Sequence, residues 1–282
     1  MSTTVFIAVI TAALLHAVWN AFVKGGQDKI LALAAVLFGH LPMAAVALLF
    51  VPLPDAASYP YIAAGAVLHA GYQVFLVHSY TRGDLTQVYP IARGSAPLIV
   101  ALFSIAVLGV VLTSMEMLAI ALIGAGIISL SLVRRADGQR NGKAAALALV
   151  TGCFIAAYSI VDGLGARLAG TALGFYAWLT IGNCILMAGY VALRSPGTFR
   201  KIPGAGRYLF IFGGGASFIA YALVTWAFTQ APIALVTALR ETSIVFALMI
   251  GVFFLKERLD LMKVFSTMTT LAGAVLLRFA RS

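Results

Sequence analysis

The polar stretch RRADGQRNGK, residues 134–143, lies at the middle of a 282-residue chain and separates two long apolar halves. Apolar residues make up 62% of the chain and charged residues 10%, whereas an average soluble domain is about 25% charged. A single soluble core cannot bury so many apolar side chains. The composition therefore excludes a soluble enzyme, a nucleic-acid-binding domain, a disordered chain and a disulfide scaffold. It predicts an all-α integral membrane protein.

Ten apolar segments are long enough to cross a bilayer, because a helix needs about 20 residues to span roughly 30 Å of hydrocarbon. The predicted spans are residues 3–23, 30–51, 59–80, 86–110, 115–133, 143–162, 171–193, 207–229, 233–255 and 260–278. Five lie on each side of the polar stretch. We therefore expect two five-helix units, 1–133 and 144–282, joined by the basic loop 134–143.

The two halves share an internal repeat. A shift of 147 residues places Arg93 on Arg240, Leu108 on Leu255, Met115 on Met262 and the pair Ala125-Gly126 on Ala272-Gly273. An odd number of spans per half forces the halves to insert with opposite orientations. The sequence thus predicts inverted five-helix repeats, an arrangement in which many transporters bind substrate near mid-membrane at the repeat interface.

Lysine and arginine are distributed unevenly between alternate loops. Fourteen lie on one side, whereas the other side has only Arg167, Arg278 and Arg281. This bias predicts that the central loop is cytoplasmic and both termini lie outside. It also accounts for the net charge of +10 without nucleic acid as a partner. The expected partners are the lipid bilayer and a small-molecule substrate, and a monomer suffices because duplication already supplies a two-fold pathway.

Arg93 and Arg240 lie inside predicted spans, where a charged group costs at least about 2.5–3.5 kcal/mol on insertion scales. Each arginine could simply fix a helix end or reach toward the interface. Alternatively, both guanidinium groups face one cavity and bind a carboxylate, phosphate or phosphonate. Neighbouring helical residues point about 100° apart, so we expect that Glu241 does not simply neutralise Arg240. Glu241 then pairs with another helix or exchanges a proton.

The segment YPIARGSAP, residues 89–97, surrounds Arg93. Pro90 and Pro97 each remove a helical hydrogen-bond donor, and Gly94 permits unusual backbone angles. We therefore expect a kinked or partly unwound helix whose free backbone groups face a cavity or other protein.

Three further spans carry polar side chains at helical spacing. These stripes are His16, Asn20 and Lys24 beside Trp19; His69, Tyr72, Gln73 and Tyr80; and Tyr158 with Asp162. A single polar residue in a membrane span more often makes a hydrogen bond to another helix. Together, however, the stripes favour one polar cavity. His40 and His78 have no polar companions at helical spacing and are interpreted as structural. The expected substrate-binding residues are Trp19, Asn20, Tyr72, Gln73, Tyr89, Arg93, Tyr158 and Arg240. The candidates for proton coupling or for binding an ammonium group are His16, Asp162 and Glu241.

No spacing typical of a metal site, a catalytic triad or a Walker A motif occurs in the sequence. We therefore expect neither a metal, nor a cofactor, nor an enzyme.

The chain resembles the EamA family of the drug/metabolite transporter superfamily over essentially its whole length. The resemblance rests on residues 16–20 (HAVWN) with Lys24, 89–94 (YPIARG), 158–163 (YSIVDG), 239–243 (LRETS) and 254–259 (FLKERL). One departure is Val110, which stands where the first repeat would carry the glutamate of the 254–259 motif. The resemblance implies proton-coupled or exchange transport of small metabolites, often amino acids and their relatives, across a bacterial inner membrane. It also implies cytoplasmic termini, contrary to the charge count.

Other functions are compatible with the same pattern. A passive channel or a structural membrane partner remains an alternative, because polar stripes alone do not establish alternating access. Within the transporter class, an exporter of apolar drugs is a further alternative. Two intramembrane arginines argue against a lipophilic cation as its substrate.

Overall fold

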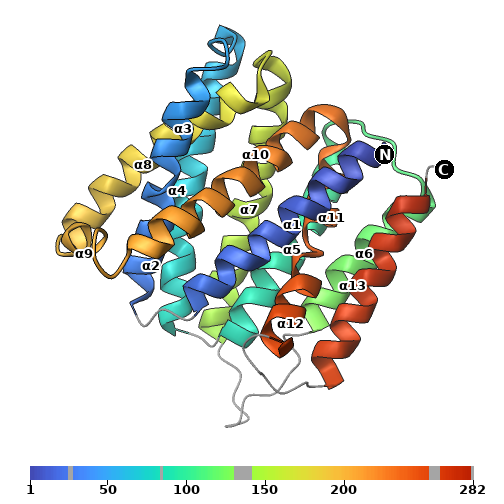
Figure 1. Ribbon diagram of the computed structural model, residues 1–282. Coiled ribbons are helices and arrows are strands. Elements are labelled where there is room, and N and C mark those ends of the chain that lie inside the picture. The colour runs from blue at the N-terminus through green and yellow to red at the C-terminus, as the bar shows by residue number, and fades with distance from the viewer. Residues whose placement is uncertain (25–27, 83–84, 130–141, 254–260, 281–282) are drawn as a thin grey trace.

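The computed structural model describes residues 1–24, 28–82, 85–129, 142–253 and 261–280, and these ranges are helical without any strand (Figure 1). The first half contains α1 (Thr3–Lys24), α2 (Lys29–Phe38), α3 (His40–Leu48), the short 3₁₀ turn η1 (Ala56–Ser58), α4 (Tyr59–Arg82), α5 (Leu85–Ala106) and α6 (Ser114–Ser129). The second half contains α7 (Gly142–Leu168), α8 (Ala172–Arg194), the short α9 (Thr198–Lys201), the π-helical turn η3 (Leu209–Gly213), α10 (Gly214–Gln230), α11 (Ile233–Arg240), α12 (Ser243–Phe253) and α13 (Leu261–Phe279).

Three of the predicted spans consist of two consecutive helical pieces. The segment 30–51 is divided into α2 and α3 at Gly39, where a Cβ atom would overlap the backbone carbonyl of Phe210. The π-helical turn precedes α10, and a turn at Glu241 and Thr242 separates α11 from α12. The first two interruptions lie where the chain segments approach closely, because a Cβ atom on Gly214 would lie 2.7 Å from the Gly39 Cα atom.

The outer surface is suited to lipid. Large apolar side chains such as Leu118, Ile185 and Phe265 are exposed. Among the described residues, six helical stretches are long and apolar enough to cross a membrane, and three shorter apolar helices accompany them. Residues 130–141, with most of the central loop, lie outside the described part. The count of ten spans and the orientation therefore stay predictions.

Both ends of the described chain lie at one end of the molecule (Figure 1). Arg278 Nη2 donates a hydrogen bond to Thr3 Oγ1 at 3.0 Å. Arg167, which the sequence places in a loop on this same side, donates from Nε and Nη2 to the carbonyl oxygens of Phe228 and Ala231, both at 2.8 Å. It thereby satisfies backbone carbonyls at the C-terminal end of α10 and fixes the turn that leads into α11.

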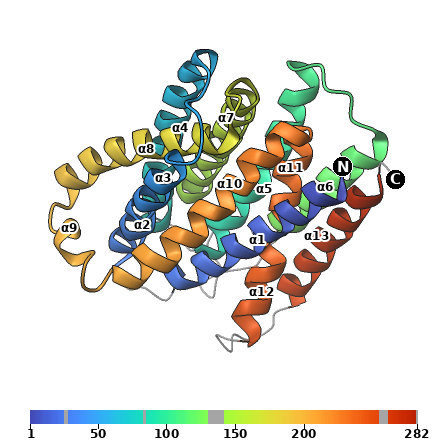
Figure 2. The same ribbon diagram turned by 45° about the horizontal axis from the view of Figure 1, so that its top comes forward.

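The helices α6 and α13 lie side by side in both views (Figures 1 and 2), and their contact is reciprocal. A Cβ atom on Gly126 would lie 3.0 Å from backbone atoms of Ser266 and Thr270, and one on Gly273 would lie 2.8 and 3.1 Å from backbone atoms of Ala119 and Ile123. The 147-residue shift converts one set of residues into the other. Two copies related by a two-fold axis make this kind of contact.

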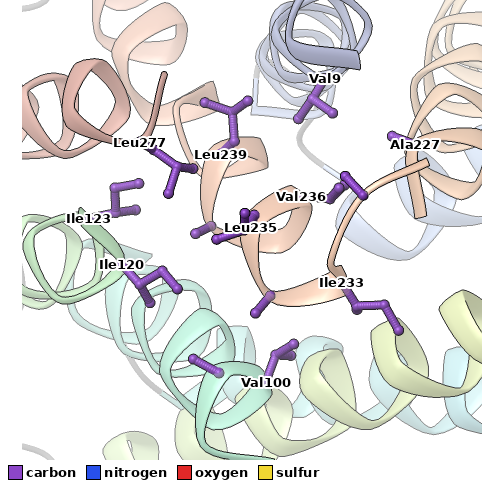
Figure 3. Packing of buried hydrophobic residues seen from close by; sticks show 14 of the residues in the cluster. Val9, Val100, Ile120, Ile123, Ala227, Ile233, Leu235, Val236, Leu239 and Leu277 are labelled. Atoms are coloured by element: carbon purple, nitrogen blue, oxygen red, sulfur yellow. The ribbon is translucent and has the colours of Figure 1, made fainter. Parts of the chain in front are cut away.

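The helix α11 is buried along its whole length. Figure 3 shows Leu235 and Leu239 of α11 surrounded by apolar side chains of α1, α5 and α6, including Val9, Val100 and Ile120. Moving each such side chain from water into a protein core contributes about 1.5–3 kcal/mol to the free energy of folding. Inside a bilayer, where lipid is equally apolar, close packing holds the helix instead. The packing fixes the position of Arg240, the last residue of α11, which is 3% exposed.

Candidate functional site

A cavity of about 130 Å³ lies between the two halves of the chain. Its walls come from α1, α2, α3, α4 and α5 of the first half and from α7, α8, α10 and α11 of the second half. One water molecule needs about 10–15 Å³ on this measure, so the space corresponds to about ten water-sized groups. The cavity therefore fits a small metabolite.

Three charged side chains meet at the α5 and α11 side of the cavity, and we call Arg93, Arg240 and Glu241 the arginine cluster. Arg93 Nε donates to Glu241 Oε2 at 2.8 Å, and Arg240 Nε lies 3.8 Å from Glu241 Oε1. All three side chains are at most 5% exposed. Two guanidinium groups thus share one carboxylate, and the cluster carries an excess of one positive charge.

Arg240 has unused hydrogen-bond donors. Its Nε and Nη2 are buried and donate to no atom of the described residues. Its guanidinium carbon lies 5.8 Å from the centre of the Tyr221 ring, within the range of a cation–π contact. Because Arg240 also lines the cavity, a bound anion could accept the hydrogen bonds that the protein leaves unmade.

The expectation that Glu241 does not simply neutralise Arg240 agrees with these distances. Glu241 pairs with another helix, through Arg93 of α5. Its other carboxylate oxygen lies within ion-pair distance of Arg240, so Glu241 interacts with both arginines.

The predicted unwinding around Arg93 was wrong. The helix α5 is continuous through Pro90, Gly94 and Pro97. A Cβ atom on Gly94 would lie 2.7 Å from Ile128 Cγ1 of α6, so this glycine serves close helix packing rather than a break. The break occurs in the matching segment of the second half, between α11 and α12. Tyr89 lies in α5, but its side chain lies outside the described part.

A second buried group surrounds Asp162 of α7, and we call His69, Asp162 and Tyr221 the Asp162 cluster. His69 Nε2 lies 2.8 Å from Asp162 Oδ2, and the Tyr221 hydroxyl donates to the same oxygen at 2.6 Å. The His69 ring also stacks on Tyr158, with ring centres 4.1 Å apart. Asp162 has 0% exposure and does not line the cavity, whereas His69, Tyr158 and Tyr221 do. The carboxylate communicates with the cavity only through its partners.

Tyr221 joins the two clusters. Its hydroxyl binds Asp162, and its ring faces the Arg240 guanidinium. Tyr221 was not predicted from the sequence, although Ser217 and Tyr221 have the i, i+4 spacing of the other polar stripes, and both line the cavity. On α8, Thr180 and Asn183 have the i, i+3 spacing of one helix face, and they also line the cavity.

The remaining predicted residues divide into two groups. His16, Trp19, Tyr72 and Gln73 line the cavity together with Arg93, Tyr158 and Arg240. Asn20 does not line it, because its side-chain amide donates to the His16 carbonyl oxygen within α1 at 2.7 Å. His40, interpreted as structural from the sequence, is part of the cavity wall, with its ring 5.9 Å from that of Phe218.

Comparison with known proteins agrees with this architecture. Residues 142–279 match the model of the EamA-like transporter family, which is part of the drug/metabolite transporter superfamily. The second half of the chain is therefore similar to the EamA-like transporter family. The matched segment carries Tyr158, Asp162, Arg240 and Glu241, and its 254–259 motif lies outside the described residues. The family match and the apolar helices together point to a multi-pass membrane protein of the transporter type.

One solved crystal structure of a protein aligns with 100% of this chain and 100% of its own, at a TM-score of 0.74 and 18% sequence identity. At this identity the likeness establishes the fold and nothing further. No curated protein matches the sequence.

Proposed function

We propose that the chain is a secondary active transporter that moves a small anionic or zwitterionic metabolite across the bacterial inner membrane by alternating access. The observation that carries the proposal is Arg240, a buried arginine that lines a cavity between both halves and whose Nε and Nη2 have no hydrogen-bond partner among the described residues. Hydrogen bonds from a guanidinium to a carboxylate are charge-assisted and directional. An EamA-like chain with such a cavity is equipped to bind an anion between its two repeats.

The interrupted helices support alternating access. The turn at Glu241 and Thr242 follows directly on Arg240 and separates α11 from α12. Discontinuous helices beside the substrate are a recurrent feature of transporters built from repeats. We propose that α12 moves relative to α11 during alternating access, while Arg240 keeps its place at the end of the packed helix α11.

The Asp162 cluster supports proton coupling. His69 and Asp162 lie at hydrogen-bond distance, and both belong to residue types that exchange protons in transport proteins. Tyr221 connects this pair to Arg240, so an anion bound at Arg240 acts on the surroundings of the Asp162 carboxylate. We propose the His69–Asp162 pair, in preference to His16 or Glu241, as the carrier of the coupled proton.

Counterflow with an Arg240→Ala variant tests the binding role. A thermal-shift panel of carboxylates, phosphates and amino acids first identifies a compound that stabilises the purified protein. Proteoliposomes are loaded with this compound, and its labelled form is added outside. Loss of charge-assisted hydrogen bonds costs about 1.5–3 kcal/mol each, so affinity should fall about tenfold to 100-fold. Arg200→Ala, which removes an exposed arginine on α9, is the matched control. Undiminished counterflow in Arg240→Ala would contradict the proposal, and flux that does not saturate would indicate a channel.

An Asp162→Asn variant tests the coupling role separately. The substitution keeps the size of the side chain but removes the group that gains and loses a proton. We expect counterflow, which needs no net proton movement, to persist while accumulation driven by an imposed pH gradient is lost. Equal loss of both activities would assign Asp162 a structural role.

A further inference from the structure

The two sides of the cavity differ in chemistry. The α5 and α11 side carries the arginine cluster, with Arg93 and Arg240 in the wall. The opposite side is the α2–α8 wall, which we define as Leu33, Leu37, Met187 and Val191. Leu37, Met187 and Val191 belong to one buried apolar cluster that joins α2 to α8. Figures 1 and 2 both show α2 and α8 on one side of the molecule and α5 and α11 toward the other.

The polar groups near the α2–α8 wall are uncharged. Thr180 and Asn183 of α8 line the cavity there, and the Asn183 side-chain oxygen has no hydrogen-bond partner among the described residues. A second carboxylate on the substrate would meet no cation on this wall within the described part of the chain. Burying an unpaired charge is costly, so this wall favours an apolar body that carries at most neutral polar groups.

The intramembrane carboxylates near the cavity are already engaged. Asp162 is covered by His69 and Tyr221, and Glu241 lies between the two arginines. No aspartate or glutamate of the described residues lines the cavity. In an α-amino acid the ammonium group is one carbon away from the carboxylate. If the carboxylate binds Arg240, the ammonium is therefore held beside two like charges without a counter-ion.

We infer that the substrate is an organic monoanion of about ten non-hydrogen atoms in all, with an apolar body and without an ammonium group. Its carboxylate binds Arg240, and its apolar body packs against the α2–α8 wall. The inference rests on the proposed function but narrows its substrate class. The arginines alone would allow an anion or a zwitterion, and the inference selects the anion.

A series of matched compounds tests the inference on the native chain. Isothermal titration calorimetry at pH 7 on the purified protein in detergent measures binding of 4-methylpentanoate and of leucine, which differs from it only by the α-ammonium group. Glutarate adds a second carboxylate, and acetate lacks the apolar body. We expect 4-methylpentanoate to bind at least tenfold more tightly than each of the other three.

The Arg240→Ala variant supplies the control for partition of 4-methylpentanoate into micelles, and it should lose the binding heat of this compound. Arg240→Gln, which keeps neutral donors in place, serves the same purpose if the alanine variant does not fold. Leucine or glutarate binding as tightly as 4-methylpentanoate overturns the inference, as does an absence of 4-methylpentanoate binding to the native chain. Each of these results leaves the proposed function standing, because counterflow is measured with a wider panel. Loss of saturable counterflow for every compound would instead refute the proposed function.

Discussion

Arg93 and Arg240 lie at matched positions of the two halves, yet their surroundings are different. Arg93 is inside the continuous helix α5 and donates to Glu241 at 2.8 Å. Arg240 ends α11, and its Nε and Nη2 make no hydrogen bond with the described residues. We propose that the duplicated arginine has taken two roles: Arg93 pairs with the counter-ion from the other half, and Arg240 binds the ligand.

The residue that follows each arginine explains this divergence. The 147-residue shift places Gly94 on Glu241. In the first half the helix packs so closely on α6 that a Cβ atom at this position would meet Ile128 at 2.7 Å. In the second half the helix is interrupted, and the same position holds a carboxylate that reaches back to Arg93. One half therefore supplies close packing and the other supplies the counter-ion.

The largest expected effect is on stability, in an Arg93→Ala variant. Removing one partner of a buried ion pair typically costs about 3–5 kcal/mol. Because Arg240 remains 3.8 Å from Glu241, we expect a loss in the free energy of unfolding near 3 kcal/mol, measured by reversible unfolding in mixed detergent–SDS micelles. Arg240→Ala should cost less than half as much, since Glu241 keeps its hydrogen bond to Arg93. Equal losses in the two variants would remove the distinction between the arginines.

A smaller effect is expected at the neighbouring glycine. Gly94→Ala adds a methyl group 2.7 Å from Ile128 and 3.2 Å from the Gly124 carbonyl oxygen, and overpacking of this kind costs about 1–3 kcal/mol. Gly189→Ala is the matched control, because this glycine of α8 has nothing within 4 Å of its added Cβ atom. There the substitution should stabilise the helix by about 0.5–1 kcal/mol. The same unfolding assay measures both variants, and a neutral Gly94→Ala would show that α5 does not depend on this close approach.

Length and apolar pattern were sufficient to predict helices in the described part of the chain, whereas the count of ten spans stays a prediction. The charged residues of the apolar segments also pointed to Arg93 and Arg240, and both line the cavity. Contacts across the molecule were not predictable in the same way. The partner of Asp162 lies 93 residues away on α4, and spacing along one helix carries no information about another. The continuity of α5 was missed because tertiary packing outweighs two prolines and a glycine.

A surface ion pair provides the reference for the buried arginines, and it should give the smallest effect. Asp28 caps α2, accepting from the Leu31 N–H at 3.0 Å, and lies 3.2 Å from Lys201 Nζ. The Leu31 hydrogen bond, and to a lesser degree Lys201, lowers the pKa of Asp28 from its ordinary value of 3.8. A lowered pKa means that the stabilisation is complete above about pH 3.8 and is lost as the pH falls through the folded-state value.

We expect Asp28→Ala to cost about 1 kcal/mol at pH 7, as for other helix caps, and progressively less below pH 4. Lys201→Ala should cost less than about 0.5 kcal/mol, and high salt should abolish its effect because exposed pairs are screened. The loss in Arg93→Ala should depend much less on salt, since the pair is at most 5% exposed and is screened less than a surface pair. If salt reduced both losses alike, the Arg93–Glu241 pair would behave as a surface pair, and its assignment as a buried counter-ion contact would fail.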